Sequence, residues 1–195
     1  MSEMIIGLAG KARVGKDTAA RFIEEWYGLE PLSFAAPLKQ SIQEMFNLTP
    51  AQMNGAEKEE PIPELGCSPR FLFQTLGTQW GRHLVHPDVW LHVAGVNLQR
   101  YRDTYREQGE RWHGCVFSDV RFDNEANWIR QQGGVVIHLD RRQAPTVRER
   151  ESEFGVGRVD GDPVVSNHST VDELYKRLRN TVDVYLEGRN EKAAC

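Results

Sequence analysis

A glycine-rich segment directly after a short apolar run constrains this chain more than any other feature. Residues 4–9 read Met-Ile-Ile-Gly-Leu-Ala, and residues 10–18 read Gly-Lys-Ala-Arg-Val-Gly-Lys-Asp-Thr. The apolar run is typical of a buried parallel strand, and an amphipathic helical pattern over residues 16–27 follows it. Glycines between a strand and a helix let backbone N–H groups converge on phosphate oxygens, and the helix N-terminus adds partial positive charge. The spacing GxxxxGK in this context predicts a phosphate-binding loop.

The predicted loop assigns roles to its own residues. Its expected phosphate contacts are Lys11, Ala12, Arg13, Val14, Gly15, Lys16, Asp17 and Thr18. Lys16 should reach the β- and γ-phosphates of a nucleotide, and the Thr18 hydroxyl should lie near a metal ion. Asp17 is unusual, because a triphosphate repels a carboxylate unless a metal, a water or an acceptor hydroxyl lies between them. Asp17 therefore either takes part in the chemistry or is a favourable acidic residue in the first helical turn.

Size and composition limit the class of protein. The 195 residues are enough for one α/β domain over residues 1–195. The formal net charge of −4 argues against nucleic acid as the principal partner. Three widely spaced cysteines without a CxxC pair favour a reducing compartment. The N-terminus does not resemble a signal peptide, and no apolar run approaches the roughly 18 residues of a membrane span, so we expect a cytoplasmic protein.

Strand and helix patterns alternate along the chain. We expect strands at about 4–9, 31–35, 115–119, 135–139 and 163–166, with helices over 16–27, from 37, 69–84, 88–108, 124–132 and 170–186. Residues 47–69 are polar and predict a connection with one short helix from Thr49. Five short strands separated by helices imply a parallel sheet covered on both faces. Ligands bind at the carboxyl ends of such strands.

The end of the predicted strand 115–119 carries a second set of chemical groups. Asp119 suits a position beside the phosphate loop, where a carboxylate holds a magnesium ion or its waters. Arg121 offers a planar fork for a second phosphate. Asp119 could instead cap the next helix, but Asp123 or Asn124 already suits that role. Glu125 is equally consistent with the site and with an ordinary first helical turn.

A third set lies on residues 68–82 and on the helix before them. Arg70 and Arg82 are twelve residues apart, so one unbroken helix could direct both toward one side. Gln74 and Trp80 lie between them and could hold a base, although the core is the more ordinary place for Phe73 and Trp80. Lys39 is either a further phosphate ligand or a solvated lysine. The candidate acceptor-binding residues are Lys39, Arg70, Gln74, Trp80, Arg82 and Arg121.

The segment 140–161 contains four arginines and glycines that could act as hinges. We interpret Arg141, Arg142, Arg148 and Arg150 as part of a closing lid, because phosphoryl transfer needs charge neutralisation and the exclusion of water. Asn167, after the last predicted strand, either contacts a donor adenine or caps the helix from Thr170. His168 has no evident partner in the sequence and is expected to be structural.

The combined pattern resembles the P-loop nucleoside monophosphate kinases, and most of all the bacteriophage-type deoxynucleoside monophosphate kinases. The resemblance rests on residues 10–18, Ser33-Phe-Ala-Ala-Pro-Leu-Lys39, QTLGTQWGR ending at Arg82, His86-Pro-Asp-Val-Trp90, and SDVRFDNE at 118–125. It implies an α/β three-layer sandwich with a five-stranded parallel sheet. It also implies an acceptor-binding helical region at about 37–87 and an arginine-bearing lid at about 140–161.

The same resemblance implies an activity. The γ-phosphate of ATP would pass to a deoxynucleoside 5′-monophosphate, with Mg²⁺, for DNA precursor synthesis. Lys16, Asp17, Asp119 and Arg121 would be catalytic, and Thr18 and Asp119 would hold the metal directly or through water. The family commonly forms homodimers, and a phage-encoded member would work in the host cytoplasm. The remaining alternatives are a dephospho-coenzyme A or phosphomevalonate kinase, and a nucleotide-binding switch or ATPase that transfers phosphate only to water.

Overall fold

The computed structural model describes residues 3–141 and 156–194. The chain packs as two compact units, one formed by Met1–Ser33 with Thr104–Cys195 and the other by Phe34–Asp103. The first unit contains the phosphate-loop segment, and the second contains the whole expected acceptor-binding region at about 37–87.

The first unit is built on a five-stranded parallel sheet. Its strands are β1 (Met4–Ala9), β2 (Glu30–Leu32), β3 (Gly114–Val120), β4 (Val135–Asp140) and β5 (Val164–Ser166), in the order β2-β3-β1-β4-β5. Ile6 of β1 pairs with Val116 on one side and Val135 on the other. Because all strands are parallel, their carboxyl ends share one edge, and the predicted sheet is confirmed. The second strand ends earlier than expected, at Leu32 rather than residue 35.

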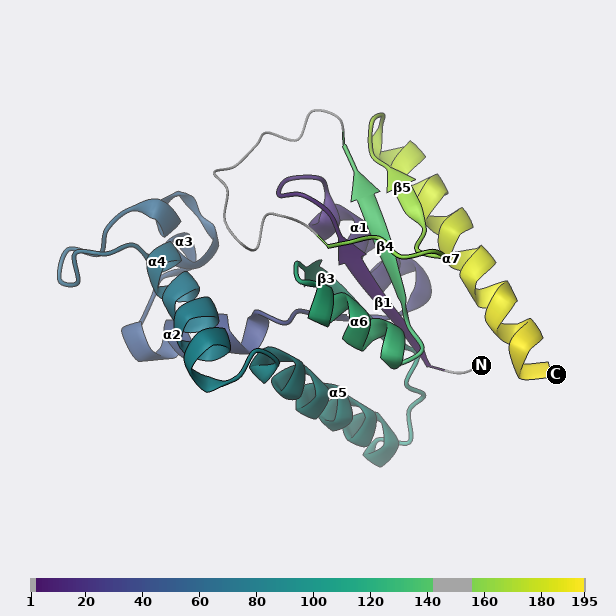
Figure 1. Cartoon of the computed structure of the whole chain (residues 1–195), viewed down its shortest axis with the longest axis horizontal. Coiled ribbons are helices and arrows are strands. Elements are labelled where there is room, and N and C mark those ends of the chain that lie inside the picture. The colour runs from purple at the N-terminus through teal and green to yellow at the C-terminus, as the bar shows by residue number, and fades with distance from the viewer. Residues whose placement is uncertain (1–2, 142–155, 195) are drawn as a thin grey trace. The chain divides into compact units, whose positions relative to one another are not determined.

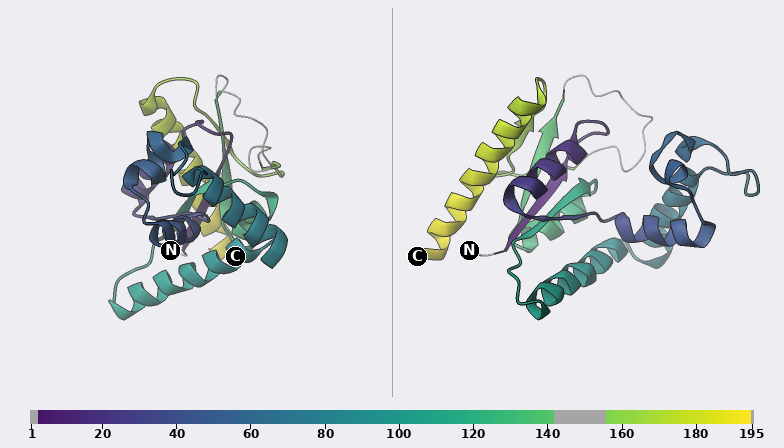
Figure 2. Two further views of the ribbon diagram at one scale, coloured as in Figure 1. Left: turned by 90° about the vertical axis from the view of Figure 1, so that its left-hand side faces the viewer. Right: turned by 180° about the vertical axis from the view of Figure 1, so that it is seen from behind.

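Helices cover both faces of this sheet, as Figures 1 and 2 show. Helices α1 (Lys16–Tyr27) and α7 (Val171–Ala194) lie on one face, and α6 (Asp123–Gln131) lies on the other. Residues of β1 alternate between the two faces, since successive strand side chains point in opposite directions. Ile6 and Leu8 belong to the core cluster that includes residues of α1 and α7. The predicted three-layer arrangement is therefore confirmed.

Helices α1 and α7 contact each other through aromatic rings and a half-buried tyrosine hydroxyl. The rings of Phe22 and Tyr175 stack with their centroids 4.5 Å apart. The Tyr27 hydroxyl donates to Asp183 Oδ1 over 2.8 Å. Burial, followed by this hydrogen bond, raises the pKa of Tyr27 above its ordinary value. The C-terminal helix is thus an integral part of the layer that supports the phosphate loop.

The second unit is helical. It contains α2 (Ala36–Phe46), α3 (Pro50–Asn54), η1 (Ala56–Glu59), α4 (Pro69–Gln74), η2 (Thr75–Val85) and most of α5 (Val89–Glu107). Its core is formed by Leu38, Ile42, Leu48, Met53, Phe73 and Trp90. The predicted short helix is α3. Thr49 caps it, because Thr49 Oγ1 accepts from the Gln52 N–H and Gln52 Oε1 accepts from the Thr49 N–H.

The helix expected over residues 69–84 is present, but it is not α-helical throughout. The segment is α-helical through Gln74 and then continues as the π-helix η2. The Trp90 indole N–H donates to the Gly77 carbonyl oxygen over 2.7 Å. Gly81 lies against the same ring, since a Cβ built there would lie 2.7 Å from Trp90 Cζ2. Packing against Trp90 therefore accompanies the wider helical turns.

Among the described residues, no helix is both long and apolar enough to cross a membrane.

Candidate active site

The phosphate-loop segment leaves β1 at the carboxyl edge of the sheet and leads into α1. Gly10, Arg13 and Gly15 all have positive φ angles, of 140°, 62° and 104°. Gly15 is the N-cap of α1, so the first unbonded N–H groups of the helix follow it directly. A side chain at Gly15 would be strained at this φ. The loop therefore presents backbone donors and a helix N-terminus at one place, as phosphate binding requires.

Lys16 folds back over this loop. Its ammonium Nζ donates to the Gly10 carbonyl oxygen over 2.7 Å and to the Lys11 carbonyl oxygen over 3.0 Å. Asp17 is exposed in the first turn of α1, and Thr18 is half-buried one residue later. The cationic group is thus held at the loop, while both interpretations of Asp17 remain open.

Asp119 lies on β3, directly beside β1, because Ala9 pairs with Val120. Its Oδ2 accepts a hydrogen bond from the Ser33 hydroxyl over 2.7 Å. Ser33 follows β2, the neighbour of β3 on the other side. This partner of Asp119 was not predicted from the sequence. The signal that could have identified it is a hydroxyl placed just after a strand that pairs with β3.

The turn after β3 is shaped by Glu125, whose role the sequence left open. Glu125 is only 2% exposed, and its Oε2 accepts from the backbone N–H groups of Arg121 at 2.8 Å and Phe122 at 3.2 Å. The expected cap by Asp123 or Asn124 is wrong, because α6 already begins at Asp123 with Phe122 as its N-cap. Asp123 Oδ1 instead accepts from the Gly157 N–H over 2.8 Å. Glu125 thus fixes the backbone that carries the exposed Arg121 side chain.

A buried ion cluster between α6, β4 and the segment before β5 was not anticipated. Asp162 accepts from Arg130 Nη2 at 2.5 Å and from Arg130 Nε at 3.2 Å, and lies 3.0 Å from His138 Nε2. Burial raises the pKa of Asp162, but the bonds from Arg130, His138 and the Val159 N–H outweigh it, and the pKa lies below its ordinary value. These contacts join the segment that contains Asp162 to α6 and β4.

Asn167 follows β5 and contacts the phosphate loop. Its Nδ2 donates to the Val14 carbonyl oxygen over 2.9 Å. The alternative that Asn167 caps the last helix is wrong, because Thr170 Oγ1 accepts from the Glu173 N–H over 3.3 Å and α7 begins at Val171. His168 does have a partner, since its Nε2 lies 3.3 Å from Asp140 Oδ2.

The second unit carries the other candidate acceptor-binding residues. Arg70 Nε pairs with Glu59 Oε1 at 2.5 Å, and Arg82 Nη1 donates to the Pro87 carbonyl oxygen at 3.2 Å. Phe73 is buried in the core as expected, whereas Trp80 is 47% exposed, so the core assignment for Trp80 is wrong. Lys39 lies half-buried on α2, and Gln74 lies at the end of α4.

The mixed helix also changes the relation between Arg70 and Arg82. A regular α-helix makes about one third of a turn beyond three full turns in twelve residues. A π-helix closes its hydrogen bonds over i→i+5 and takes more residues per turn, so η2 reduces that offset. The backbone positions of Arg70 and Arg82 therefore lie closer to one side of the helical segment than on the regular α-helix that we expected.

Comparison with known proteins identifies a family for this chain. The family model for deoxynucleotide monophosphate kinase matches residues 63–178. The chain belongs to the deoxynucleotide monophosphate kinase family. A provisionally named deoxynucleotide monophosphate kinase of Acanthamoeba polyphaga mimivirus is 34% identical over 187 residues, which cover 92% of this chain and 96% of the relative.

Phage members of the family match shorter stretches. The deoxynucleoside-5′-monophosphate kinase of Escherichia phage T5 is 32% identical over 48% of this chain and 32% of its own length. The deoxynucleotide monophosphate kinase of Enterobacteria phage T4 is 27% identical over 60% of this chain and 46% of its own length. The resemblance inferred from the motifs is thus confirmed, and the chain is a kinase.

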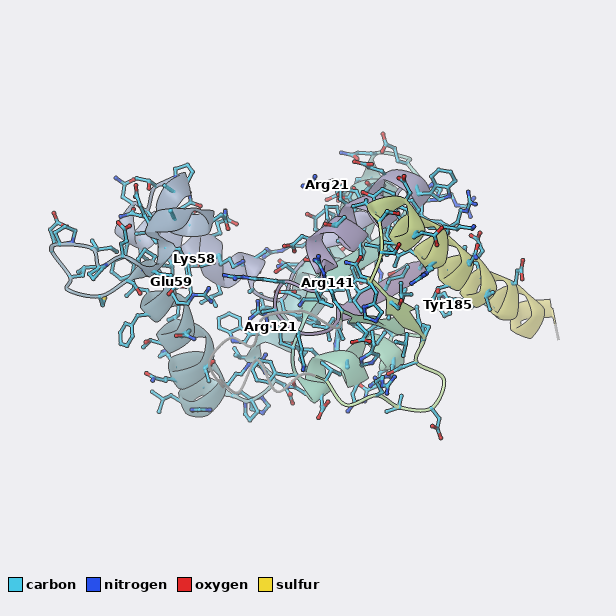
Figure 3. All side chains as sticks on the ribbon, turned by 90° about the horizontal axis from the view of Figure 1, so that it is seen from above. Arg21, Lys58, Glu59, Arg121, Arg141 and Tyr185 are labelled. Atoms are coloured by element: carbon cyan, nitrogen blue, oxygen red, sulfur yellow. The ribbon has the colours of Figure 1, made fainter. Side chains whose placement is uncertain are left out.

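The deoxynucleotide monophosphate kinase match includes the whole of the predicted lid at about 140–161. Arg141 follows β4 and is exposed, and Figure 3 shows it and Arg121 on the α/β unit. Arg142, Arg148 and Arg150 lie outside the described residues. The lid itself therefore remains a prediction.

Proposed function

We propose that this kinase transfers the γ-phosphate of ATP to a deoxynucleoside 5′-monophosphate, giving ADP and the diphosphate for DNA precursor synthesis. One observation carries the proposal: a chain of this family places a GxxxxGK loop and Asp119–Arg121 on neighbouring strands at the carboxyl edge of one parallel sheet. Two candidate phosphate-binding sites at one edge, the loop and Asp119–Arg121, favour transfer of a phosphoryl group from one phosphate to another over simple nucleotide binding.

The loop would hold the donor phosphates. Backbone N–H groups of residues 11–18 and the N-terminus of α1 supply donors and partial positive charge. Lys16 would exchange its carbonyl partners on Gly10 and Lys11 for phosphate oxygens of ATP. The positive charge of Lys16 would then stabilise the negative charge on the phosphate oxygens in the transition state of phosphoryl transfer. Asp17 would orient the attacking oxygen, and no strong base is needed because a monophosphate is already anionic.

The donor set near the loop fits Mg²⁺. Thr18 and Asp119 offer a hydroxyl and a carboxylate, which are oxygen ligands of the kind that Mg²⁺ prefers. The described residues contain no group of three or more His, Cys, Asp or Glu that could hold a metal alone. This fits an ion that arrives with ATP and keeps phosphate and water ligands. When bound, it would neutralise charge on the phosphates.

Arg121 is proposed to bind the acceptor phosphate, because its guanidinium is exposed while its backbone is fixed by Glu125. In the second unit, we propose acceptor-binding roles for Lys39, Arg70, Gln74, Trp80 and Arg82. The Arg70–Glu59 pair is partly exposed and is worth at most about 1 kcal/mol, so phosphate can replace it. The exposed Trp80 ring offers a stacking surface for a base.

We also propose roles for the lid arginines and for Asn167, and we propose the partners and location of the protein. Arg141 and the other lid arginines would neutralise transferred charge and exclude water. Asn167 is a candidate for contact with adenine. We also propose small nucleotides rather than nucleic acid as partners, a homodimer, and a place in the cytoplasm, of the host where the gene is viral.

A panel of acceptors tests this function. ADP release from ATP is measured with deoxynucleoside monophosphates, ribonucleoside monophosphates, dephospho-coenzyme A and phosphomevalonate, each against a reaction without acceptor. We expect deoxynucleoside monophosphates to stimulate ADP release most strongly. Stimulation only by one of the last two compounds would assign a different small-molecule kinase. ADP release that no acceptor stimulates would indicate an ATPase or a switch.

A further inference from the structure

Two loops that are far apart in the sequence meet at the carboxyl edge of the sheet. Asn167, after β5, donates from Nδ2 to the carbonyl oxygen of Val14 within the phosphate loop, 2.9 Å away. Val14 is only 1% exposed, and the contact joins residues 153 positions apart. This is a side-chain bond from one loop to the backbone of the other, placed where the donor phosphates are proposed to bind.

The contact controls the direction of a neighbouring N–H group. The Val14 carbonyl and the Gly15 N–H belong to one peptide unit, which is planar and trans, so the two groups point in opposite directions. Holding the carbonyl oxygen toward Asn167 therefore turns the Gly15 N–H away from Asn167. We propose that Asn167 is a positioning residue that orients this peptide so that the Gly15 N–H serves as a phosphate donor. The proposal rests on the proposed binding of ATP phosphates by residues 10–18.

Asn167 is itself anchored independently of the phosphate loop. Its backbone N–H donates to the Asp140 carbonyl oxygen at the end of β4 over 2.7 Å. The preceding residue, Ser166, is held by Arg177 of α7, whose Nη1 donates to the Ser166 carbonyl oxygen over 2.9 Å. The same guanidinium nitrogen contacts the Ser166 hydroxyl. A residue whose backbone is anchored in this way can hold its side chain against a neighbouring loop.

Gly15 provides the close approach that this arrangement needs. A Cβ built on Gly15 would lie 2.5 Å from Asn167 Nδ2, closer than atoms of this kind pack. The absence of a side chain at Gly15 therefore allows the Asn167 amide to lie against the loop. Glycine at position 15 therefore serves two needs: it leaves room for Asn167, and it adopts a positive φ angle.

Inorganic tripolyphosphate has no base, so its binding distinguishes orientation of the phosphate loop by Asn167 from contact of Asn167 with adenine. The dissociation constants of ATP, GTP and inorganic tripolyphosphate are measured by calorimetry for the wild type, Asn167→Ala and Asn167→Leu. The leucine variant keeps the approximate side-chain volume and removes the amide donor. We expect both variants to bind all three compounds about tenfold more weakly, because losing one well-placed hydrogen bond has about that effect. Asn180→Ala, an exposed change on α7, is the matched control and should bind as the wild type does.

Hydrogen exchange supplies a second readout that needs no ligand. Amides of residues 10–18 should exchange faster in both Asn167 variants than in the wild type and in Asn180→Ala. Weaker binding of ATP alone, with tripolyphosphate binding and exchange unchanged, would overturn the proposal in favour of an adenine contact. Unchanged binding of all three compounds would also overturn it. Neither measurement depends on phosphoryl transfer, so an inactive wild type that binds tripolyphosphate would contradict the proposed function alone.

Discussion

Arg121 combines an exposed side chain with a fixed backbone. The buried Glu125 carboxylate accepts the Arg121 N–H, so the guanidinium starts from a defined position after β3. A fixed planar fork suits a phosphate that must be held in line with the donor. We therefore propose that Arg121 binds the acceptor rather than ATP.

Replacing Arg121 should separate the two substrates. In Arg121→Ala, we expect the KM for the deoxynucleoside monophosphate to rise at least about tenfold, while the KM for ATP changes much less, because the lost bonds are made to the acceptor. Steady-state kinetics with each substrate varied measure both constants. Arg111→Ala, an exposed change outside the site, is the control. Equal effects on both KM values would remove Arg121 from the acceptor site.

Asp162 should make the free energy of unfolding depend on pH. Its pKa is lowered in the folded protein relative to about 3.9 in the unfolded chain, so its ionised form stabilises the fold above about pH 4. That contribution is lost as the pH falls from about 4 through the folded-state pKa. In Asp162→Asn, we expect the free energy of unfolding at pH 7 to fall by about 2 kcal/mol, because charge-assisted bonds to Arg130 are lost.

Chemical denaturation between pH 3 and pH 7 checks this expectation. The difference between the wild type and Asp162→Asn should shrink as the pH falls below about 4. Asp160→Asn, at an exposed neighbouring position, should follow the wild type. A constant difference across this range would show that the carboxylate charge of Asp162 does not contribute as described.

At the scale of elements, the periodic patterns in the sequence predicted where helices and strands lie, but not the type of every helix or its capping contacts. The expected helix over residues 16–27 and the five strands were recovered because burial on one or both faces leaves a clear periodicity. Residues 69–85 were predicted less well, since an α-helix and a π-helix share nearly the same apolar pattern. The cap of α6 was missed because Glu125 reaches back from inside the helix.

The π-helix η2 provides an element-scale prediction. Gly81 is buried, and a Cβ there would lie 2.7 Å from Trp90 Cζ2 and 3.0 Å from the Leu76 carbonyl oxygen. Gly81→Ala should therefore lower the free energy of unfolding by about 1–3 kcal/mol, as overpacking of a core does. Urea denaturation measures the change.

Gly188→Ala is the matched control for this substitution. Gly188 lies within α7, and a Cβ there meets no atom within 4 Å. This change should stabilise the protein by about 0.5–1 kcal/mol, because alanine loses less backbone entropy than glycine in a helix. A Gly81→Ala variant as stable as the wild type would show that the close contact with Trp90 does not constrain η2.

At the scale of the whole molecule, the parallel sheet determines where chemistry is placed. The loops after β1, β3, β4 and β5 all leave one edge, so motifs distant in the sequence lie on one rim. The sequence predicted those groups that form contiguous motifs, such as Lys16 and Asp119. It did not predict the pairs Ser33–Asp119, Asn167–Val14 or Arg130–Asp162, because periodicity identifies the face of a side chain and not its partner.

We propose that the Lys16 loop delivers the γ-phosphate of ATP to a deoxynucleoside monophosphate. The most direct measurement follows the label from [γ-³²P]ATP in the presence of dTMP, dGMP or dCMP, for the wild type, Lys16→Ala and the exposed control Lys176→Ala. We expect the label in a deoxynucleoside diphosphate, with turnover at least about a hundredfold lower in Lys16→Ala alone. Label found only in inorganic phosphate would contradict transfer to the acceptor, and wild-type turnover in Lys16→Ala would contradict the role of Lys16.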